Sequence, residues 1–153
     1  MTSTQKSGAD HVSTRLFETA RGIVHAWQCD HMGHANLRAY GEFFEQALWQ
    51  LFFHLGLTPT ALRGEIRMAG VQQNISYRRE LLAGDLIYVR SRLAEISERK
   101  LRMEHELLNV ESNEVCAICE LTAVCIDAST RQPRPFPQEV KTRAAHLLYG
   151  THP

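Results

Sequence analysis

The stretch LRAYGEFFEQALWQLFFHL, residues 37–55, is the most apolar part of the chain and decides how it folds. Its apolar side chains recur at the i, i+3, i+4, i+7 spacing of one wide helical face, and polar residues take the opposite side. The apolar set is Tyr40, Phe43, Phe44, Ala47, Leu48, Leu51, Phe52 and Leu55. A helix of this length is about 28 Å long. It must be covered by another element, and a curved sheet is the cover that we expect.

The residues at the two ends of this stretch support the helix. Asn36 is a favourable N-cap residue, and Gly56 is a favourable terminator. Trp49 and Phe53 interrupt the polar side, which indicates that the helix is covered on more than one flank.

Alternating apolar and polar residues predict five strands around this helix. They lie at residues 17–28, from residue 66 to about Tyr77, and at 85–95, 101–110 and 115–127. A short helical turn is expected after Thr58-Pro59, and a short helix at residues 139–148. The inward positions of two strands are predicted to be Ile87, Val89, Ser91 and Leu93, and Leu101, Met103, His105 and Leu107. Short turns between the last three strands indicate an antiparallel meander, which the first strand must join.

Composition restricts the classes of function. The 153 residues, 44% of them apolar, can form one ordinary domain, which we place at residues 16–150 after a disordered leader at 1–15. A formal net charge of zero argues against a nucleic-acid binder. The start of the chain lacks the apolar core of a signal peptide, and no apolar run reaches the roughly 18 residues of a membrane span. We therefore expect a cytoplasmic protein without a membrane partner.

The cysteines do not predict a metal site. Cys116 and Cys119 have the C-x-x-C spacing, but in a strand residues three apart point to opposite faces. No second cysteine pair follows at the spacing of a zinc ribbon. We expect no metal and no cofactor.

The sequence CDHMGHAN, residues 29–36, directly precedes the long helix. Together with Tyr40 and FFEQA on that helix, it resembles the hotdog-fold acyl-CoA thioesterases, in particular the 4-hydroxybenzoyl-CoA thioesterase-like family. SYRRELLAGD at residues 76–85 and DASTRQPRPFP at 127–137 are similar to further family segments. The resemblance covers roughly residues 16–148.

The resemblance implies an α+β hotdog fold, in which an antiparallel sheet of five or slightly more strands wraps one long central helix. It implies an enzyme that hydrolyses acyl-CoA to a carboxylic acid and free CoA. It also implies a homodimer or homotetramer with the active site at the subunit interface. The chain departs from its relatives at Leu37, often a second Asn, and at Leu48, often Arg, which indicates a diverged substrate pocket.

Thioester hydrolysis needs an acid group and a site that stabilises the oxyanion. Asp30 supplies the carboxylate, either as a nucleophile or as a base that activates water. The first N–H groups of a helix lack intrahelical partners and carry the positive end of the dipole. The family resemblance makes the backbone N–H of Leu37 the oxyanion donor. Gly33 lets the loop turn sharply.

Several further residues are candidates for the site. His34 is expected to shape the loop or pocket, with His31 a weaker candidate. Asn36 is expected to cap the helix and can also contact substrate. In some hotdog thioesterases the catalytic acid lies on a helix, which makes Glu42 and Glu45 reserve candidates.

Basic residues near a hairpin can bind the phosphates of CoA. Arg99, Lys100 and Arg102 belong to the turn ERKLR, and a similar basic turn in relatives contacts the nucleotide, here in the partner's site if the chain dimerises. Arg78 and Arg79 form a second basic pair.

Two other functions remain open. A non-catalytic acyl-thioester binding module keeps the fold without the chemistry, and a hotdog hydratase or dehydratase pairs an Asp with a His. Neither the acyl group nor the carrier, CoA or a phosphopantetheine protein, follows from the sequence.

Overall fold

A computed structural model describes residues 15–150 of the chain, so the expected leader at 1–15 lies outside the described residues except for Arg15. Five strands form one sheet in the order β1-β3-β4-β5-β2, and all its pairings are antiparallel. The strands are β1 (Phe17–Ile23), β2 (Ile66–Tyr77), β3 (Leu86–Ile96), β4 (Lys100–Asn109) and β5 (Val115–Asp127). The helices are α1 (Leu37–His54), α2 (Gln138–Tyr149) and the short 3₁₀ turns η1 (Ala26–Gln28) and η2 (Ala61–Arg63).

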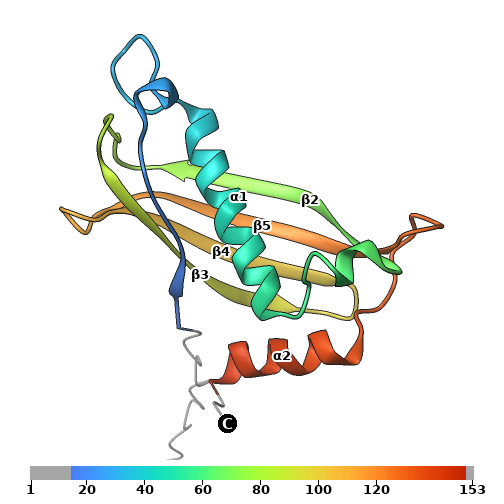
Figure 1. Ribbon diagram of the computed structural model, residues 1–153. Helices are drawn as coiled ribbons and strands as arrows, with labels where there is room; N and C mark the ends of the chain where they lie inside the picture. The colour runs from blue at the N-terminus through green and yellow to red at the C-terminus, as the bar shows by residue number, and fades with distance from the viewer. Residues whose placement is uncertain (1–14, 151–153) are drawn as a thin grey trace, which may run out of the picture.

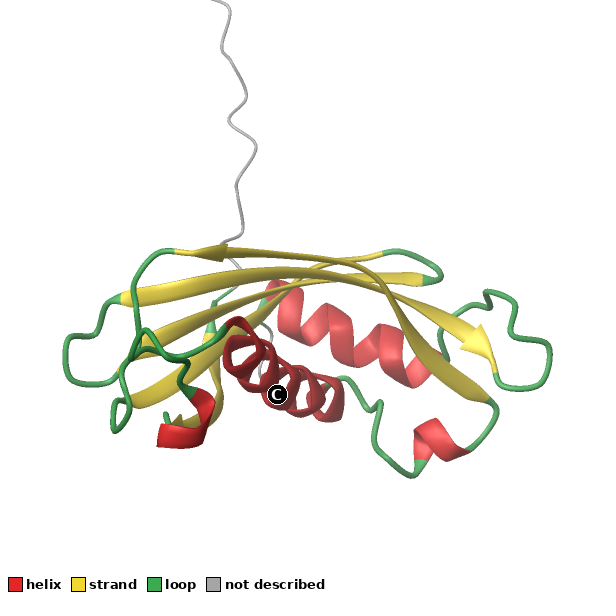
Figure 2. Ribbon diagram, turned by 90° about the horizontal axis from the view of Figure 1, so that it is seen from above, coloured by secondary structure: helices red, strands yellow, loops and turns green. Residues whose placement is uncertain are grey.

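The sheet arches over both α-helices, which lie on its concave side (Figures 1 and 2). The α+β fold with a curved sheet around a long helix is therefore confirmed. None of the helices in residues 15–150 is long and apolar enough to cross a membrane.

The core forms between α1 and the inward side chains of the sheet. The predicted inward residues of β3 and β4 are all buried, including Ser91 and His105, which have no exposed surface. On α1, the predicted apolar face is buried at Phe43, Phe44 and Leu51. Trp49 and Phe53 remain about half exposed, at 47% and 58%, so nothing within the described part of the chain covers the second flank.

The first strand is shorter than predicted. It ends at Ile23 instead of continuing to residue 28, because the backbone of Val24 pairs with the β2–β3 loop: Val24 N–H donates to Asp85 O at 2.9 Å, and Gly84 N–H donates to Val24 O at 2.7 Å. The side chain of Gln28 then accepts from His25 N–H at 2.9 Å and closes the turn η1.

The prediction that Cys116 and Cys119 face opposite sides of the sheet is wrong. A register shift pairs Leu107 with Ala117 but Leu108 with Val115, so Cys116 is an extra, bulged residue. Both thiols lie in the same apolar cluster, where burial raises their pKa values. Within residues 15–150, no three His, Cys, Asp or Glu side chains are grouped closely enough to hold a metal ion.

Three loops lie at the end of the sheet where α1 begins (Figure 1). Residues 24–36 lead into the helix, residues 78–85 connect β2 to β3, and residues 110–114 connect β4 to β5. This end of the molecule carries the motif that precedes the helix.

Candidate active site

The loop that carries Asp30 is a small closed turn held by main-chain hydrogen bonds. Cys29 and Ala35 form an antiparallel bridge. Inside it, Asp30 N–H donates to His34 O at 3.1 Å, and Gly33 N–H donates to Asp30 O at 3.0 Å. Gly33 has a φ of +88°, a conformation that glycine adopts without steric cost. The sharp turn expected at this glycine is therefore present.

The carboxylate of Asp30 keeps one oxygen free of protein donors. Its Oδ1 accepts from the backbone N–H of Met32 at 2.9 Å, and no donor among residues 15–150 bonds Oδ2. The side chain is only partly exposed. One oxygen thus fixes the carboxylate in place, while the other can act on a substrate or a water molecule.

Asn36 caps the helix as expected. Its Oδ1 accepts from Ala39 N–H at 3.0 Å, and its own N–H donates to Gln28 O at 2.9 Å. None of the hydrogen bonds within the described residues uses the N–H of Leu37. The helix start therefore leaves a donor at the positive end of the dipole for a ligand.

Asp30, Asn36 and Leu37 line one cleft of about 380 Å³. The structure therefore brings the predicted acid and the predicted oxyanion donor to the same hollow, together with His34. The remaining lining residues are Met32, Ala35, Tyr40, Tyr77, Arg78, Arg79 and Glu80. Of these, Arg78 and Arg79 are the second basic pair of the sequence analysis, whereas Met32, Ala35 and Glu80 are not predicted site residues.

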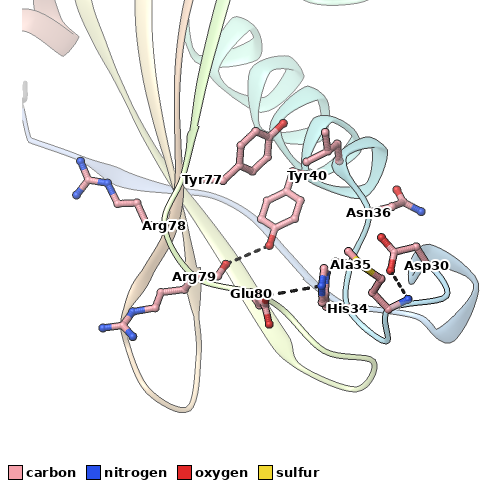
Figure 3. A pocket seen from close by; sticks show the side chains of 11 residues that line it. Asp30, His34, Ala35, Asn36, Tyr40, Tyr77, Arg78, Arg79 and Glu80 are labelled. Carbon is pink, nitrogen blue, oxygen red and sulfur yellow. Dashed lines mark hydrogen bonds and ion pairs between the residues drawn. The ribbon is translucent and has the colours of Figure 1, made fainter.

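The far wall of the cleft is the segment that follows β2 (Figure 3). The hydroxyl of Tyr40 donates to Arg79 O at 3.1 Å and so ties this segment to α1. Tyr77 packs edge-on against Tyr40, with ring centroids 5.1 Å apart. Burial is the main cause that raises the pKa of Tyr40 to about 12, so its hydroxyl stays a donor at neutral pH.

His34 faces this wall rather than the carboxylate. Its Nε2 lies 3.6 Å from Oε1 of Glu80. No side-chain hydrogen bond or ion pair joins Asp30 to His31 or His34 in residues 15–150, so an Asp–His pair has no support from the contacts.

The reserve acids lie outside the cleft. Glu42 accepts from the side-chain amide of Gln28 at 3.2 Å. Glu45 is exposed one turn further along α1 and lines a separate cavity. Neither carboxylate joins Asp30 at the helix start.

Of the two basic groups, only Arg78 and Arg79 contribute to the lining of this cleft, and their side chains point away from Asp30 (Figure 3). Arg79 also pairs with Glu114 at 3.2 Å. The turn after β3, with Arg99 and Lys100, lies at the opposite end of the sheet, because β4 spans about 30 Å between this turn and the loop at residues 110–114. At that end, Phe136 N–H donates to Glu98 O. Arg102 on β4 is paired with Glu95 at 3.3 Å.

Comparison with known proteins finds a matching family and a similar curated protein. The model of the thioesterase-like superfamily matches residues 24–144. Long-chain acyl-CoA thioesterase FadM of Escherichia coli is 24% identical over 125 residues, which cover 82% of this chain and 95% of FadM.

Two solved structures share the fold. Staphylococcus aureus SAV2348 in complex with CoA superposes with a TM-score of 0.82 at 21% identity, over 91% of this chain and 87% of that one. Slr0204, a 1,4-dihydroxy-2-naphthoyl-CoA thioesterase from Synechocystis, gives 0.76 at 19% identity, over 86% and 96%. The likeness to these structures confirms the hotdog fold.

Proposed function

The chain belongs to the thioesterase-like superfamily, and from that premise we propose that it is an acyl-CoA thioesterase. The reaction adds water across the bond between the carbonyl carbon and sulfur of the thioester. The products are a carboxylic acid and free CoA. The observation that carries the proposal is the shared cleft of Asp30 and the start of α1.

The carboxylate of Asp30 and the N–H of Leu37 have separate roles in the reaction. The free oxygen of Asp30 either takes a proton from an attacking water or attacks the carbonyl carbon itself. In the second route the acyl group becomes a mixed anhydride with Asp30 as the thiolate leaves, and water then hydrolyses that anhydride. Negative charge then develops on the carbonyl oxygen, which accepts from the N–H of Leu37. As the C–S bond breaks, the electron pair leaves with the CoA sulfur, a good leaving group because a thiol has a pKa of about 8.5.

The remaining cleft residues position the substrate. Asn36 holds the helix start through its cap and is one of the residues that line the cleft. His34, held beside Glu80, shapes the wall. Arg78 and Arg79 lie on the far wall with their side chains directed away from Asp30 (Figure 3), where they can meet the phosphate-bearing carrier outside the cleft.

A homodimer completes this site in our proposal. The strand β2 is an edge of the sheet, and an unpaired edge is a template for a second strand. Beside it, Val71 and Tyr77 are 59% and 45% exposed, and Trp49 and Phe53 on α1 are exposed too. Pairing two copies along this surface covers the open flank of α1. Sedimentation velocity tests the assembly, and a monomer at micromolar concentration contradicts it.

In such a dimer the distant basic turn serves the partner's cleft. Arg99 and Lys100 have no ion pair within residues 15–150, whereas Arg102 does. We therefore expect Arg99→Ala and Lys100→Ala to raise KM for acyl-CoA, and Arg102→Ala to do so less. Equal KM values in all three variants and the wild type contradict this role.

The function is tested by following free thiol during incubation with a panel of acyl-CoA esters of different chain length and polarity. Release of thiol together with the matching acid supports the proposal. Binding of acyl-CoA without thiol release from any ester favours the binding-module alternative instead.

A further inference from the structure

Gln28, the last residue of the turn η1, is a buried polar residue beside the loop that carries Asp30, and it is only 5% exposed. The other buried polar residues within 15–150 are Thr19, Ser91 and His105, which contact one another across β1, β3 and β4. An amide that is removed from water costs free energy unless its oxygen and its nitrogen find partners. The partners of Gln28 therefore show what its burial serves.

The oxygen of this amide closes η1. Oε1 of Gln28 accepts from the backbone N–H of His25 at 2.9 Å, as the third residue of a helical turn does in a capping box. Glutamate and glutamine both serve at this position, because the cap needs only an acceptor. Closing the turn therefore does not explain why residue 28 is an amide.

The nitrogen of the amide reaches the long helix. Nε2 of Gln28 donates to Oε2 of Glu42 at 3.2 Å, and Glu42 is a half-buried residue in the second turn of α1. The amide cannot be turned round, because its oxygen must face the N–H of His25. The carboxylate of Glu42 has no other hydrogen bond or ion pair among residues 15–150. A glutamate at position 28 could close η1 but could not donate to Glu42, so this contact explains the amide.

Gln28 also stands at the base of the active-site loop. Its main-chain oxygen accepts from the N–H of Asn36 at 2.9 Å, so residues 28 and 36 frame the loop at 29–35. Asp30 follows Gln28 by two residues, and Leu37 directly follows Asn36. Both groups that the proposed reaction uses are therefore close in sequence to this base.

The bond to Glu42 ties the base of the loop to the helix itself. Main-chain bonds close the loop and join it to the β2–β3 loop, where Ala35 N–H donates to Leu81 O. Within the described residues, the contact of Gln28 with Glu42 is the one hydrogen bond between segment 24–30 and a residue of α1. The N–H of Leu37 belongs to α1, whereas Asp30 follows Gln28. The contact therefore links the position of the carboxylate to that of the oxyanion donor.

We propose that Gln28 is a positioning residue of the thioesterase reaction. Its amide, held by Glu42, sets the place of the Asp30 carboxylate relative to the N–H of Leu37. Neither Gln28 nor Glu42 lines the cleft, so the pair acts on kcat rather than on substrate binding. A displacement of about 1 Å at a catalytic group can lower a rate about 10²-fold. The inference rests on the proposed thioesterase function.

Exchanging the two side chains tests the contact. Gln28→Glu keeps an acceptor for the N–H of His25 but sets a carboxylate against Glu42. For an acyl-CoA ester that the wild type hydrolyses, kcat should fall about 10- to 100-fold, while KM stays within about twofold. Adding Glu42→Gln supplies a donor from the other side, and the double variant should recover kcat to within about threefold of the wild type. A double variant no faster than Gln28→Glu overturns the inference, as does a wild-type kcat in Gln28→Glu.

A control separates positioning from stability. Thr19→Val breaks the hydrogen bonds of another buried polar residue, to Val89 O and to the hydroxyl of Ser91, outside the active-site loop. It should lower the urea midpoint and leave kcat within about twofold of the wild type. A loss of kcat in Thr19→Val as large as that in Gln28→Glu would mean that lower stability alone explains the loss, and overturns the inference.

Dependence on Asp30 gives a readout that a purely structural role would not produce. Because the contact acts by placing this carboxylate, Gln28→Glu should lower the residual kcat of Asp30→Asn by no more than about twofold. A further loss in the Asp30→Asn background as large as in the wild type means that Gln28 acts through another group, and overturns the inference.

A second pair of variants leaves the buried segment untouched and serves if Gln28→Glu does not fold. Glu42→Ala removes the acceptor and should lower kcat more than Glu42→Gln, whose amide oxygen can still accept from Gln28. Equal kcat in Glu42→Ala and Glu42→Gln overturns the inference. Absence of thiol release from the wild type would overturn the proposed hydrolysis itself, whereas wild-type turnover with equal kcat in every variant of Gln28 and Glu42 overturns only the role of this pair.

Discussion

Oδ1 of Asp30 accepts a hydrogen bond from the backbone N–H of Met32 at 2.9 Å, and this contact leaves the second carboxylate oxygen for chemistry. An asparagine at the same position can accept the same bond with its amide oxygen. The structural and the chemical roles of this residue can therefore be separated by one substitution.

Asp30→Asn should keep the fold and lose the reaction. We expect kcat to fall by a factor of about 10² to 10⁴, the usual contribution of a positioned acid–base group, with little change in the melting temperature. Asp127→Asn is a matched control, because Asp127 also accepts from backbone N–H groups in a turn, those of Ser129 and Thr130, far from the cleft. Near-unchanged kcat in both Asp30→Asn and Asp30→Ala would remove Asp30 from the mechanism.

Gly33→Ala should lower the activity of the enzyme more than the stability of the domain. A φ of +88° at this position costs a residue with a Cβ about 1–2 kcal/mol, and relief of that strain moves Asp30, whose main-chain oxygen accepts from the N–H of residue 33. We expect kcat/KM to drop clearly while the urea midpoint changes little. The control is Gly70→Ala, at which no left-handed φ or close atom opposes a Cβ. Equal activity of the two variants would show that the turn does not position the carboxylate.

Tyr40→Phe should loosen the far wall of the cleft. It removes the 3.1 Å hydrogen bond to Arg79 O, which is worth about 1 kcal/mol, and should raise KM for acyl-CoA more than it lowers kcat. Tyr77→Phe is the control, since no hydrogen bond of the Tyr77 hydroxyl occurs in the described part of the chain. A larger effect on KM from Tyr77→Phe than from Tyr40→Phe would contradict this assignment.

The same tyrosine predicts a loss of stability in alkali. Its folded-state pKa of about 12 lies above the ordinary tyrosine value of 10.0, so the folded state favours the neutral phenol. The resulting stabilisation is complete below pH ~10 and disappears as the pH rises towards the folded pKa. Urea unfolding of the wild type between these two pH values should show this loss, and Tyr40→Phe should show less of it. If the free energy of unfolding falls equally with pH in the wild type and in Tyr40→Phe, Tyr40 is not the cause of the loss of stability.

His105 predicts a loss of stability in mild acid. Its pKa is lowered from 6.5 to about 4 by burial, so the folded state favours the neutral ring. This stabilisation is complete above pH ~6.5 and is lost as the pH falls towards the folded pKa, about 2 kcal/mol being gone by pH ~5. Urea unfolding at neutral pH and at pH ~5 measures it, and His105→Gln should remove much of the difference. A wild type equally stable at both pH values would contradict the assignment.

Local patterns predicted the fold well. The apolar stripe over residues 37–55 gave a helix that ends one residue earlier, at His54, and alternation gave the inward faces of β3 and β4. Residues 24–28 were assigned to a strand because their alternation continues. Their backbone instead bonds a loop near Asp85, a contact between distant segments that periodicity cannot reveal.

Only part of the candidate site can be predicted from the sequence. The motif located Asp30 and the helix start, but the wall that follows β2 depends on how strands pair in space. His105 occupied an inward position in the alternation of β4, and a polar residue there was the available signal for the separate cavity that it lines with Glu45. That its Nε2 has no hydrogen-bond partner among residues 15–150 became visible only once the contacts of its ring were known.

Main-chain groups hold the reactive loop: Ala35 N–H donates to Leu81 O at 2.7 Å, and Asn36 N–H donates to Gln28 O at 2.9 Å. Such bonds survive most replacements of the side chains around them. Evolution can therefore exchange the residues that choose an acyl group, such as those along α1 and β2, without displacing the carboxylate. This architecture favours a family whose members differ widely in substrate specificity while they catalyse one reaction.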